Sequence, residues 1–230
     1  MSAPLTNGLD RARRGLRRFG VAGSIRRLAS SAGASLSRAL YVHERHVWYA
    51  LDLTAPVSQA ACSSGFDLVQ ATVDDVALLE ELPTIGVSEA RERQAAGAVL
   101  WLVREGPQVA FACWIFRGRT PVFAARRGWL SLPAHTVCLE DSVTSPAYRG
   151  RGLAGAAWAE IARALQRQHV ATIITKVADD NTASRRAVEK AGFEAIAMMT
   201  LIRRGLRSRV TLVPSRRTPL TAFLEAALAR

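Results

Sequence analysis

The chain has 230 residues, about half of them hydrophobic, which suits one globular domain with a sizeable core and excludes an intrinsically disordered chain. Its longest apolar runs, such as VAFACWIF at 109–116, are far shorter than the ~18–20 residues that span a bilayer, which excludes an integral helical membrane protein. The net charge of +12, nearly all of it from arginine, favours anionic partners such as phosphates, nucleic acid or an acidic membrane surface.

Three groups of residues indicate the expected compartment and the absence of a bound metal. They are the residues near the N-terminus, the cysteines and the histidines. Arginines occupy positions where a secretory signal would be apolar, so we expect no signal peptide and a cytoplasmic protein. Cys62, Cys113 and Cys138 fit neither a metal-ligand spacing nor an even set of disulfides, which agrees with a reducing compartment. His43 and His46 stand three apart without a second ligand pair, so we expect a surface or packing role and no bound metal.

Residues 1–40 differ in composition from the rest of the chain. No acidic residue occurs from Arg11 to Arg38, and apolar residues recur at helical spacing between glycines, which predicts broken helices. Three interpretations remain open: a basic arm that lies on anionic lipid at the membrane periphery, an organelle transit peptide, or a helix that packs on the domain with solvated arginines. We do not expect nucleic acid as a partner.

The pattern after residue 40 predicts strands and helices in alternation. Residues 41–53 are aromatic and β-branched, as in a strand, and a Pro/Ser/Gly-rich linker follows. The order of elements predicts a single α/β domain with a mixed sheet and helices on both faces. We expect a basic, partly helical arm at 1–40, an extra strand and linker at 41–65, the domain itself at 66–213 and a C-terminal helix at 214–230. Within the domain and the C-terminal segment, apolar periodicity predicts strands at 66–73, 99–106, 108–116, 136–144, 171–177, 193–204 and 207–213, and helices at 74–82, 88–98, 151–168, 182–192 and 219–229.

The stretch SPAYRGRGLAG at 145–155 joins the strand at 136–144 to the long helix. A helix N-terminus carries about half a positive charge and several unpaired amide groups, which suit phosphate oxygens. Gly150 and Gly152 would let a ligand approach the backbone closely, and Arg149 and Arg151 would add two cations that can bind phosphate bidentately. The stretch therefore predicts a site for a pyrophosphate or a similar polyanion, against the simpler interpretation of an ordinary turn with solvated arginines.

Two motifs resemble those of the GNAT superfamily of acyl-CoA-dependent N-acyltransferases. Arg149, Gly152 and Ala154 match its acyl-CoA-binding pattern Arg/Gln-x-x-Gly-x-Gly/Ala, preceded by the usual proline and an aromatic residue. The second motif follows at the family's distance and consists of the strand ATIITKV and the segment DDNTASRRAVEKAGF at 179–193. The early order of strands and helices is also similar to this family, and the resemblance extends over residues 66–204.

The resemblance implies a splayed sheet, in which acyl-CoA enters where the strand at 136–144 diverges from the strand at 171–177. Its pyrophosphate would rest on the amides of residues 149–154, and its pantetheine arm would pair with the backbone of residues 143–145. The implied reaction is acetyl transfer to a primary amine of a small-molecule or sugar-like acceptor, with a different acyl chain as the alternative. We therefore expect acetyl-CoA as the acyl donor, no metal, and as cofactor-binding residues Val143, Thr144, Ser145, Arg149, Gly150, Arg151, Gly152, Leu153, Ala154, Asn181 and Ser184.

Acyl transfer to an amine requires a base, a donor for the oxyanion and a group that protonates the leaving thiolate. Strand alternation at 136–144 predicts Cys138, Glu140 and Ser142 on one face, and Asp141 and Val143 on the other. The resemblance implies a base on this strand, with Glu140 as the first choice and Asp141 as the second, although either carboxylate could be the structural partner of an arginine. The oxyanion donor would be a backbone amide near Ser142 or Val143.

One position departs from the family pattern. The tyrosine that often protonates the leaving thiolate is replaced by Val188, so Ser184 or a water would have to serve. Asn181 and Ser184 could also act only as helix-capping residues. The departure keeps open a non-catalytic acyl-CoA-binding protein, or a basic protein that docks on a membrane or nucleic acid, as alternatives to an enzyme. The arginine-rich segment 117–129 would lie near the acceptor and indicates either an anionic or sugar-like acceptor or a solvated basic loop.

Overall fold

The computed structural model describes residues 41–205 and 207–229, so the expectations for residues 1–40 lie outside the described residues. The chain divides into two compact units, and the unit made of residues 43–202 and 208–230 contains nearly all of the described fold. The other unit contributes only residues 41–42, 203–205 and 207 to the description.

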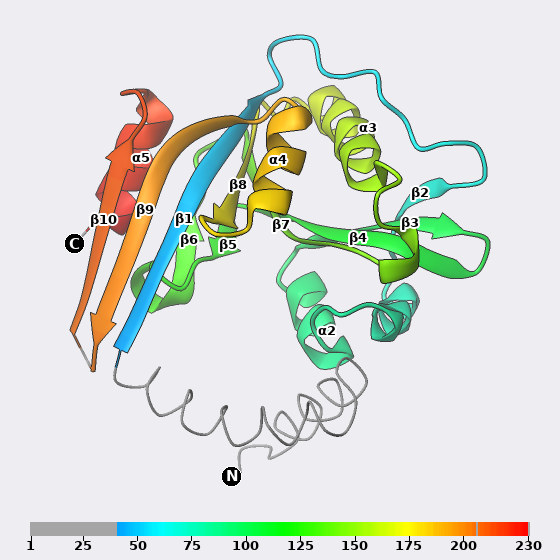
Figure 1. Cartoon of the computed structure of the whole chain (residues 1–230), viewed down its shortest axis with the longest axis horizontal. Coiled ribbons are helices and arrows are strands. Elements are labelled where there is room, and N and C mark those ends of the chain that lie inside the picture. The colour runs from blue at the N-terminus through cyan, green and yellow to red at the C-terminus, as the bar shows by residue number, and fades with distance from the viewer. Residues whose placement is uncertain (1–40, 206, 230) are drawn as a thin grey trace, which may run out of the picture. The chain divides into compact units, whose positions relative to one another are not determined.

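An eight-stranded sheet in the order β10-β9-β1-β8-β7-β4-β3-β2 forms the centre of the fold (Figure 1). β2, β3, β4 and β7 are antiparallel neighbours, whereas β7 and β8 run parallel, so the sheet is mixed as predicted. The strands are β1 (Tyr41–Asp52), β2 (Asp67–Gln70), β3 (Val99–Glu105), β4 (Gln108–Arg117), β7 (Thr136–Thr144), β8 (Thr172–Ala178), β9 (Glu194–Arg204) and β10 (Arg207–Pro214).

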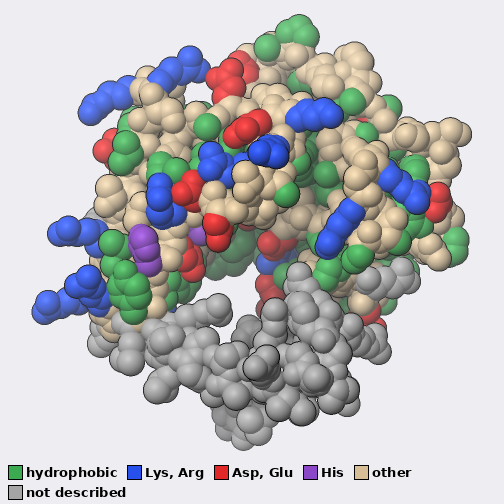
Figure 2. Space-filling view, viewed as in Figure 1, with side chains coloured by type: hydrophobic (Ala, Val, Ile, Leu, Met, Phe, Trp, Pro, Cys, Tyr) green, Lys and Arg blue, Asp and Glu red, His purple; other side chains and the backbone are tan. Residues whose placement is uncertain are grey.

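Helices lie on both faces of this sheet, which confirms the predicted fold class (Figure 1). α3 (Leu153–Arg167) and α4 (Thr182–Lys190) cover one face, and α2 (Val87–Ala95) lies against the other. The helix predicted at 74–82 is a 3₁₀ helix, η1 (Asp74–Glu81), and α5 (Pro219–Leu228) follows β10. Figure 2 shows Lys and Arg side chains spread over the face seen in Figure 1, with acidic side chains between them.

One large buried cluster lies between the sheet and the helices α3 and α4. α3 buries Leu153, Ala157, Ile161 and Leu165, which are the apolar positions whose spacing predicted the helix. These residues belong to one buried cluster that also includes Val137 of β7. Burial of a Leu or Ile side chain contributes about 1.5–3 kcal/mol relative to exposure, so this apolar stripe holds α3 firmly against β7.

β1 lies in the middle of the sheet, between β9 and β8. It pairs antiparallel with β8 from His46–Ala178 to Asp52–Thr172. Trp48 and Tyr49 of this strand are fully buried, on opposite faces of the sheet. The strand expected before the domain is therefore hydrogen-bonded inside the sheet of the domain.

A second sheet consists of two short strands, β5 (Arg119–Pro121) and β6 (Trp129–Ser131), joined through the 3₁₀ turn η2 (Arg126–Gly128). The segment that the sequence suggested as a basic loop thus forms a hairpin. Thr120 and Leu130 face each other and are buried, whereas Arg119 and Trp129 on the next register pairs are exposed. The hairpin consequently has a buried inner side and an exposed outer side.

Candidate active site

The parallel strands β7 and β8 pair over only a short distance. Their register pairs are Thr136–Thr172, Val137–Ile173 and Cys138–Ile174. β7 continues to Thr144 and β8 to Ala178, yet within the described residues no further pair joins the two strands. Beyond Cys138 the strands therefore diverge, as expected of a splayed sheet, and one edge of β7 has no strand partner.

The other edge of β7 is held by β4. Phe111 pairs with Thr144, Ala112 pairs with Val143, and the backbone nitrogen of Ser145 donates to the carbonyl of Ala110 at 2.8 Å. Backbone groups of an extended strand point alternately to its two sides, so residues 143–145 also present groups toward the diverging gap. An extended chain that enters the gap could use those groups as a further strand would.

The glycine-arginine stretch forms the turn between β7 and α3. It begins with the 3₁₀ turn η3 (Pro146–Tyr148), and Gly150 and Gly152 follow with φ of 78° and 74°. These left-handed conformations require glycine or a tolerant residue such as Asn or Asp. A Cβ atom added at either glycine would meet nothing within 4 Å, so the space in front of the turn is open. Positive φ, more than crowding, is therefore why glycine stands at both positions.

α3 begins at Leu153 with Gly152 as its N-cap residue, and no side chain of the described residues caps it. The first amide groups of a helix have no intrahelical partner and attract anions. Arg149 and Arg151 are exposed beside this end, and the Arg151 guanidinium carbon lies 5.1 Å from the centroid of the Tyr148 ring. The turn has the amides, the open space and the positive charge that a pyrophosphate requires. Of the remaining residues predicted here, Leu153 is buried and Ala154 is half-buried.

Tyr148 fixes this turn to the neighbouring strands. Its hydroxyl lies 2.8 Å from Oε2 of Glu105 and 2.8 Å from Oε1 of Gln108, at the β3–β4 turn. Its ring packs edge-to-face against Phe66 at a centroid distance of 5.9 Å. The buried tyrosine thus holds the start of the glycine-arginine turn in place, while the arginines on either side of Gly150 stay at the surface.

β7 contains a β-bulge next to the candidate base. Trp114 of β4 pairs with Glu140, but Ala112, two residues earlier, pairs with Val143, three residues later. One extra residue of β7 is therefore accommodated between these pairs, where Asp141 adopts a φ of 48°. A bulge leaves a backbone group of the extra residue without its ladder partner. The amide predicted as oxyanion donor, near Ser142 or Val143, lies at this irregularity.

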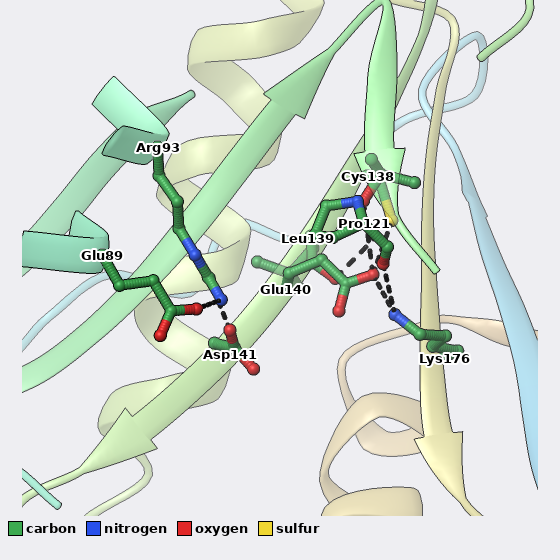
Figure 3. A network of polar contacts seen from close by, with 9 residues as sticks. Glu89, Arg93, Pro121, Cys138, Leu139, Glu140, Asp141 and Lys176 are labelled. Atoms are coloured by element: carbon green, nitrogen blue, oxygen red, sulfur yellow. Dashed lines mark hydrogen bonds and ion pairs between the residues drawn. The ribbon is translucent and has the colours of Figure 1, made fainter. Parts of the chain in front are cut away.

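The bulge makes the predicted alternation of β7 wrong beyond Glu140. Ser142 does not share the face of Glu140, because its Oγ accepts a hydrogen bond at 3.1 Å from Nε1 of Trp158, on the α3 side of the sheet. Asp141 lies on the side of Glu140 instead of the opposite one, because it pairs with Arg93 of α2. Both carboxylates therefore contact partners on the α2 side of the sheet (Figure 3).

Glu140 is a buried carboxylate, with 9% of its side chain exposed, and it forms an ion pair with Lys176 of β8 (Figure 3). Cys138 Sγ at 3.3 Å and Thr120 Oγ1 at 3.4 Å also donate to it. All three donors contact Oε1, and Oε2 accepts no hydrogen bond from the described residues. The ion-pair partner of Glu140 is a lysine and not the arginine that the sequence suggested. The contact uses Oε1, so Oε2 of Glu140 remains available to a substrate.

Burial and ion pairing shift the pKa values of Glu140 and Lys176 in opposite directions. Burial raises the pKa of Glu140 above its ordinary value, and the ammonium of Lys176 offsets part of that rise. Burial alone would lower the pKa of Lys176, but the carboxylate of Glu140, with smaller contributions from Cys138 and Asp141, raises it above its ordinary value. Lys176 therefore stays protonated, next to a carboxylate that binds a proton more readily than an exposed one.

Asp141 belongs to a separate charged group. Arg93 of α2 contacts Asp141 through Nη1, and its Nη2 lies 2.9 Å from Oε1 of Glu89, one helical turn earlier (Figure 3). The guanidinium carbon of Arg93 also lies 5.6 Å from the ring centroids of both Trp114 and Phe116. Asp141 is thus the structural partner of an arginine, the second role that the sequence left open for it.

Asn181 and Ser184 form the N-terminal cap of α4. The backbone nitrogen of Ser184 donates to Oδ1 of Asn181 at 3.2 Å. Val188, where the family often has a tyrosine, is 3% exposed and belongs to the buried cluster. Asn181 therefore caps α4, whereas contact of Asn181 or Ser184 with acetyl-CoA stays a prediction. Val188 packs in the core and has no proton to donate.

A family model described as "Acetyltransferase (GNAT) family" matches residues 70–193, which is more than half of the chain. This chain belongs to the GNAT family. The matched segment begins at the end of β2 and ends after α4, so it includes the diverging strands, the bulge and the glycine-arginine turn. A search of curated proteins finds no match.

Solved structures share the fold at low identity. A GCN5-related N-acetyltransferase from Sphaerobacter thermophilus has a TM-score of 0.52 and 14% identity over 84% of this chain and 59% of that one. A tandem GNAT protein from the clavulanic acid biosynthesis pathway has a TM-score of 0.52 and 14% identity, covering 82% and 59%. A GCN5-related N-acetyltransferase from Kribbella flavida has a TM-score of 0.50 and 12% identity, covering 80% and 64%. This GNAT chain spans less than two thirds of the length of each.

Two residues at the candidate site were missed from the sequence, although one of them carried a signal. Lys176 is one of only two lysines in the chain, and it stands in the apolar strand ATIITKV, where an ionisable residue needs a partner. Arg93 carried no such signal, because a helix with several charged residues is usually a solvated surface. Its role depends on the packing of α2 over Trp114 and Phe116.

His46 has a more specific environment than the predicted surface or packing role. It precedes Trp48 by two residues on β1, so it lies on the face of the sheet where the Lys176 ammonium lies 5.9 Å from the centroid of the Trp48 ring. Its Nδ1 is buried without a hydrogen-bond partner among the described residues. Burial lowers the pKa of His46, Lys176 lowers it further, and Glu44 and Asp180 oppose this change.

Metal ligation and membrane spanning find no support in the described residues. No group of three or more His, Cys, Asp or Glu side chains there could hold a metal ion. None of the helices between residues 41 and 229 is long and apolar enough to cross a membrane. The candidate site consists of strands, one bulge and a helix N-terminus.

Proposed function

We propose that this GNAT protein transfers the acetyl group of acetyl-CoA to a primary amine of a small-molecule or sugar-like acceptor. The observation that carries the proposal is the divergence of β7 and β8 after the Cys138–Ile174 pair, beside the uncapped N-terminus of α3. An unpaired strand edge beside an uncapped helix N-terminus suits a long ligand with phosphates at one end and a reactive thioester at the other. The family match supports acyl transfer in general.

The donor would be held at both ends. The amides at the start of α3, with Arg149 and Arg151, would bind the pyrophosphate. Residues 143–145 would pair through their backbone with the pantetheine arm along the free edge of β7. Acetyl-CoA supplies the activated acyl group, and the residues of this chain orient it at the bulge.

The bulge would supply the donor that the oxyanion needs. A backbone amide near Ser142 or Val143, freed from the ladder, is rigid because the strand is paired on both sides of the irregularity. Ser142 is further restrained by its hydrogen bond with Trp158. A fixed amide costs no reorganisation when negative charge develops on the carbonyl oxygen, which is why such donors are effective.

Glu140 is the proposed base for the acceptor amine. Its Oε1 is held by Lys176, Thr120 and Cys138, so the carboxylate has one orientation, and its Oε2 could accept a proton directly or through water. The raised pKa of Glu140 makes it a stronger base than an exposed glutamate. Ser184 or a bound water would return a proton to the thiolate, because Val188 cannot.

The decisive experiment is a thiol-release assay with acetyl-CoA and a panel of amines that includes amino sugars, peptides and polyamines. We expect release that depends on one class of amine and is lost with Glu140→Gln. Parallel assays with longer acyl chains test the alternative donor. Tight acetyl-CoA binding without amine-dependent release across the panel would instead identify a non-catalytic acyl-CoA-binding protein, which the buried Val188 keeps as the second candidate.

A further inference from the structure

The β5–β6 hairpin, residues 119–131, has two chemically different sides. Its inner side is buried: Thr120 is 0% exposed and Leu130 2%. Thr120 donates to Glu140, and Lys176 donates to the carbonyl of Pro121 at 3.4 Å, so this side closes over the buried ion pair. The outer side carries the exposed residues Arg119, Phe123, Arg126, Arg127 and Trp129.

The outer side is basic and has no acidic residue to balance it. The segment from Arg117 to Ser131 contains no Asp or Glu. Arg119, Arg126 and Arg127 form no ion pair with a carboxylate within the described part of the chain. Three cations on one short hairpin favour an anionic partner.

Two large apolar side chains are exposed among these arginines. Phe123 is 55% exposed and Trp129 is 38% exposed, and they are two of the five large hydrophobic residues exposed in the described chain. Arginines beside exposed aromatic residues are the composition of surfaces that lie in the headgroup region of an anionic membrane.

The backbone at the tip of the hairpin has a left-handed conformation at Arg127, which is less favourable for arginine than for glycine. Arg127 has φ of 60° and ψ of 18°, and Gly128 follows with φ of 78°. Glycine adopts the left-handed conformation more readily than arginine does. The chain nevertheless has arginine at 127, although a glycine would suit the backbone better. Among the described residues, Arg127 is one of four non-glycine residues with positive φ, and its side chain is exposed at the tip.

We propose that the outer side of the β5–β6 hairpin docks on an anionic lipid membrane. The three arginines bind headgroup phosphates, and the exposed edge of Trp129 lies among the headgroups. The inner side of the same hairpin contacts Glu140 and Lys176, so a docked membrane lies near the α2 side of the candidate active site. The docking does not depend on the proposed acyl transfer.

Lipid fits this surface better than a nucleic acid does. Proteins that bind single-stranded nucleic acids stack bases on the faces of aromatic rings along a positively charged groove. One face of Trp129 is covered by the Arg119 guanidinium, whose carbon lies 4.7 Å from the ring centroid, and Phe116 packs edge-on against the ring at 6.5 Å. Trp129 is therefore a poor stacking platform, whereas its exposed edge suits an interface.

Co-sedimentation of the full chain with vesicles tests the proposal. Vesicles of phosphatidylcholine with phosphatidylglycerol are compared with vesicles of phosphatidylcholine alone. The hairpin variant combines Arg119→Gln, Arg126→Gln and Arg127→Gln, and the matched control combines Arg91→Gln, Arg167→Gln and Arg186→Gln, which are exposed on α2, α3 and α4. We expect the hairpin variant to lose at least about tenfold in affinity for anionic vesicles and the control about threefold or less. Equal losses, or no binding by the parent, overturn the proposal.

A single variant separates docking from folding. Arg127→Gly relieves the left-handed backbone, so we expect an unchanged or higher melting temperature together with weaker vesicle binding. A titration with single-stranded RNA completes the test: if the hairpin variant loses RNA affinity but keeps its vesicle affinity, the partner is a nucleic acid and the lipid proposal is wrong.

Discussion

Lys176 of β8 forms an ion pair with Glu140 of β7 two residues beyond the last pair that joins these strands. The contact therefore crosses the gap at the point where the strands begin to diverge. Cys138, Thr120 and the hairpin carbonyl of Pro121 surround it, so both charges are removed from bulk water. A buried pair of this kind fixes the orientation of both side chains. The proposed base is therefore held by an ion pair that also joins β7 to β8 beyond their last backbone pair.

Replacement of Glu140 by Gln tests the proposed base. A free alkylamine, with a pKa near that of lysine at about 10.4, is mostly protonated at neutral pH and cannot attack. A positioned base typically contributes about 100- to 10,000-fold, so Glu140→Gln should reduce turnover by at least about 100-fold with acetyl-CoA affinity nearly unchanged. Part of the lost rate should return as pH rises, because more of the amine is then free.

The control for this variant is Asp141→Asn. Asn also tolerates the left-handed φ of 48° at the bulge, so the variant removes charge without adding backbone strain. It should affect turnover less than Glu140→Gln does. If Glu140→Gln, shown by circular dichroism to be folded, matches the parent at neutral pH, then Glu140 is structural. The role of base then passes to Asp141, to solvent or to His46, whose buried Nδ1 has no hydrogen-bond partner among the described residues.

Replacement of Lys176 tests how much its ion pair with Glu140 contributes to the free energy of unfolding. Lys176→Met leaves Glu140 buried without its cation, and breaking a buried pair in this way typically costs about 3–5 kcal/mol in the free energy of unfolding near neutral pH. Burial already raises the pKa of Glu140 in the folded state, and loss of Lys176 raises it further. The carboxyl then protonates in the folded state at a higher pH than in the unfolded state, where its pKa is about 4.3.

This shift predicts the pH dependence of the Lys176→Met penalty. Below the unfolded pKa the carboxyl is protonated in both states and the penalty is small, and the penalty grows as pH rises through the folded pKa. Denaturant unfolding at about pH 5 and at about pH 7.5 should therefore show a smaller loss at the lower pH. Lys190→Met, at the exposed end of α4, is the matched control. A loss that is the same at both pH values would contradict the burial of an unpaired carboxylate.

Gly152→Asp tests where the phosphates lie. The variant adds a negative side chain in the open space in front of the helix N-terminus, so acetyl-CoA affinity should fall about tenfold or more, about 1.4 kcal/mol. Gly152→Asn carries similar strain at φ 74° without the charge and should lose less. Isothermal titration calorimetry measures both. Equal affinity of the parent and a folded Asp variant would place the pyrophosphate elsewhere.

Removal of residues 1–40 tests whether the acyltransferase pattern is sufficient for chemistry. These residues precede every motif of the site, and a chain that begins at Tyr41 still contains all of β1. We expect thioester turnover with the best amine to stay within about threefold of the full chain, since no proposed catalytic group is removed. Loss of turnover in a folded chain would mean that residues 1–40 contribute to the active site.

The cysteines should be unreactive in the native protein. Burial, with Glu160 nearby, raises the pKa of Cys62 to about 12, and burial raises the pKa of Cys113 and Cys138 as well. A thiol with such a pKa is almost entirely protonated at neutral pH and reacts slowly. A chromogenic disulfide should therefore label the native chain slowly and all three thiols rapidly after denaturation. Rapid labelling of Cys138 in the folded protein would show a reactive thiolate beside Glu140 and contradict this prediction.

Local patterns in the sequence were sufficient for most elements of this GNAT domain. The spacing of Leu153, Ala157, Ile161 and Leu165 predicted the buried face of α3, because a helix places every third or fourth residue on one side. The glycine-arginine turn could also be predicted, because left-handed φ values and unpaired amides belong to residues adjacent in the chain. Such features depend on neighbours a few residues away.

Only the tertiary structure decided which groups meet at the site. The bulge at Asp141 arises from the register between β4 and β7, so it reversed an alternation that the composition of β7 alone predicted. β1 entered the middle of the sheet by pairing with β8, more than a hundred residues later in the chain. Glu140 and Lys176, 36 residues apart, meet because the parallel register that ends at Cys138–Ile174 places each of them two residues further along its strand. Register and long-range pairing depend on the packing of the whole sheet, and a residue's chain neighbours do not encode them.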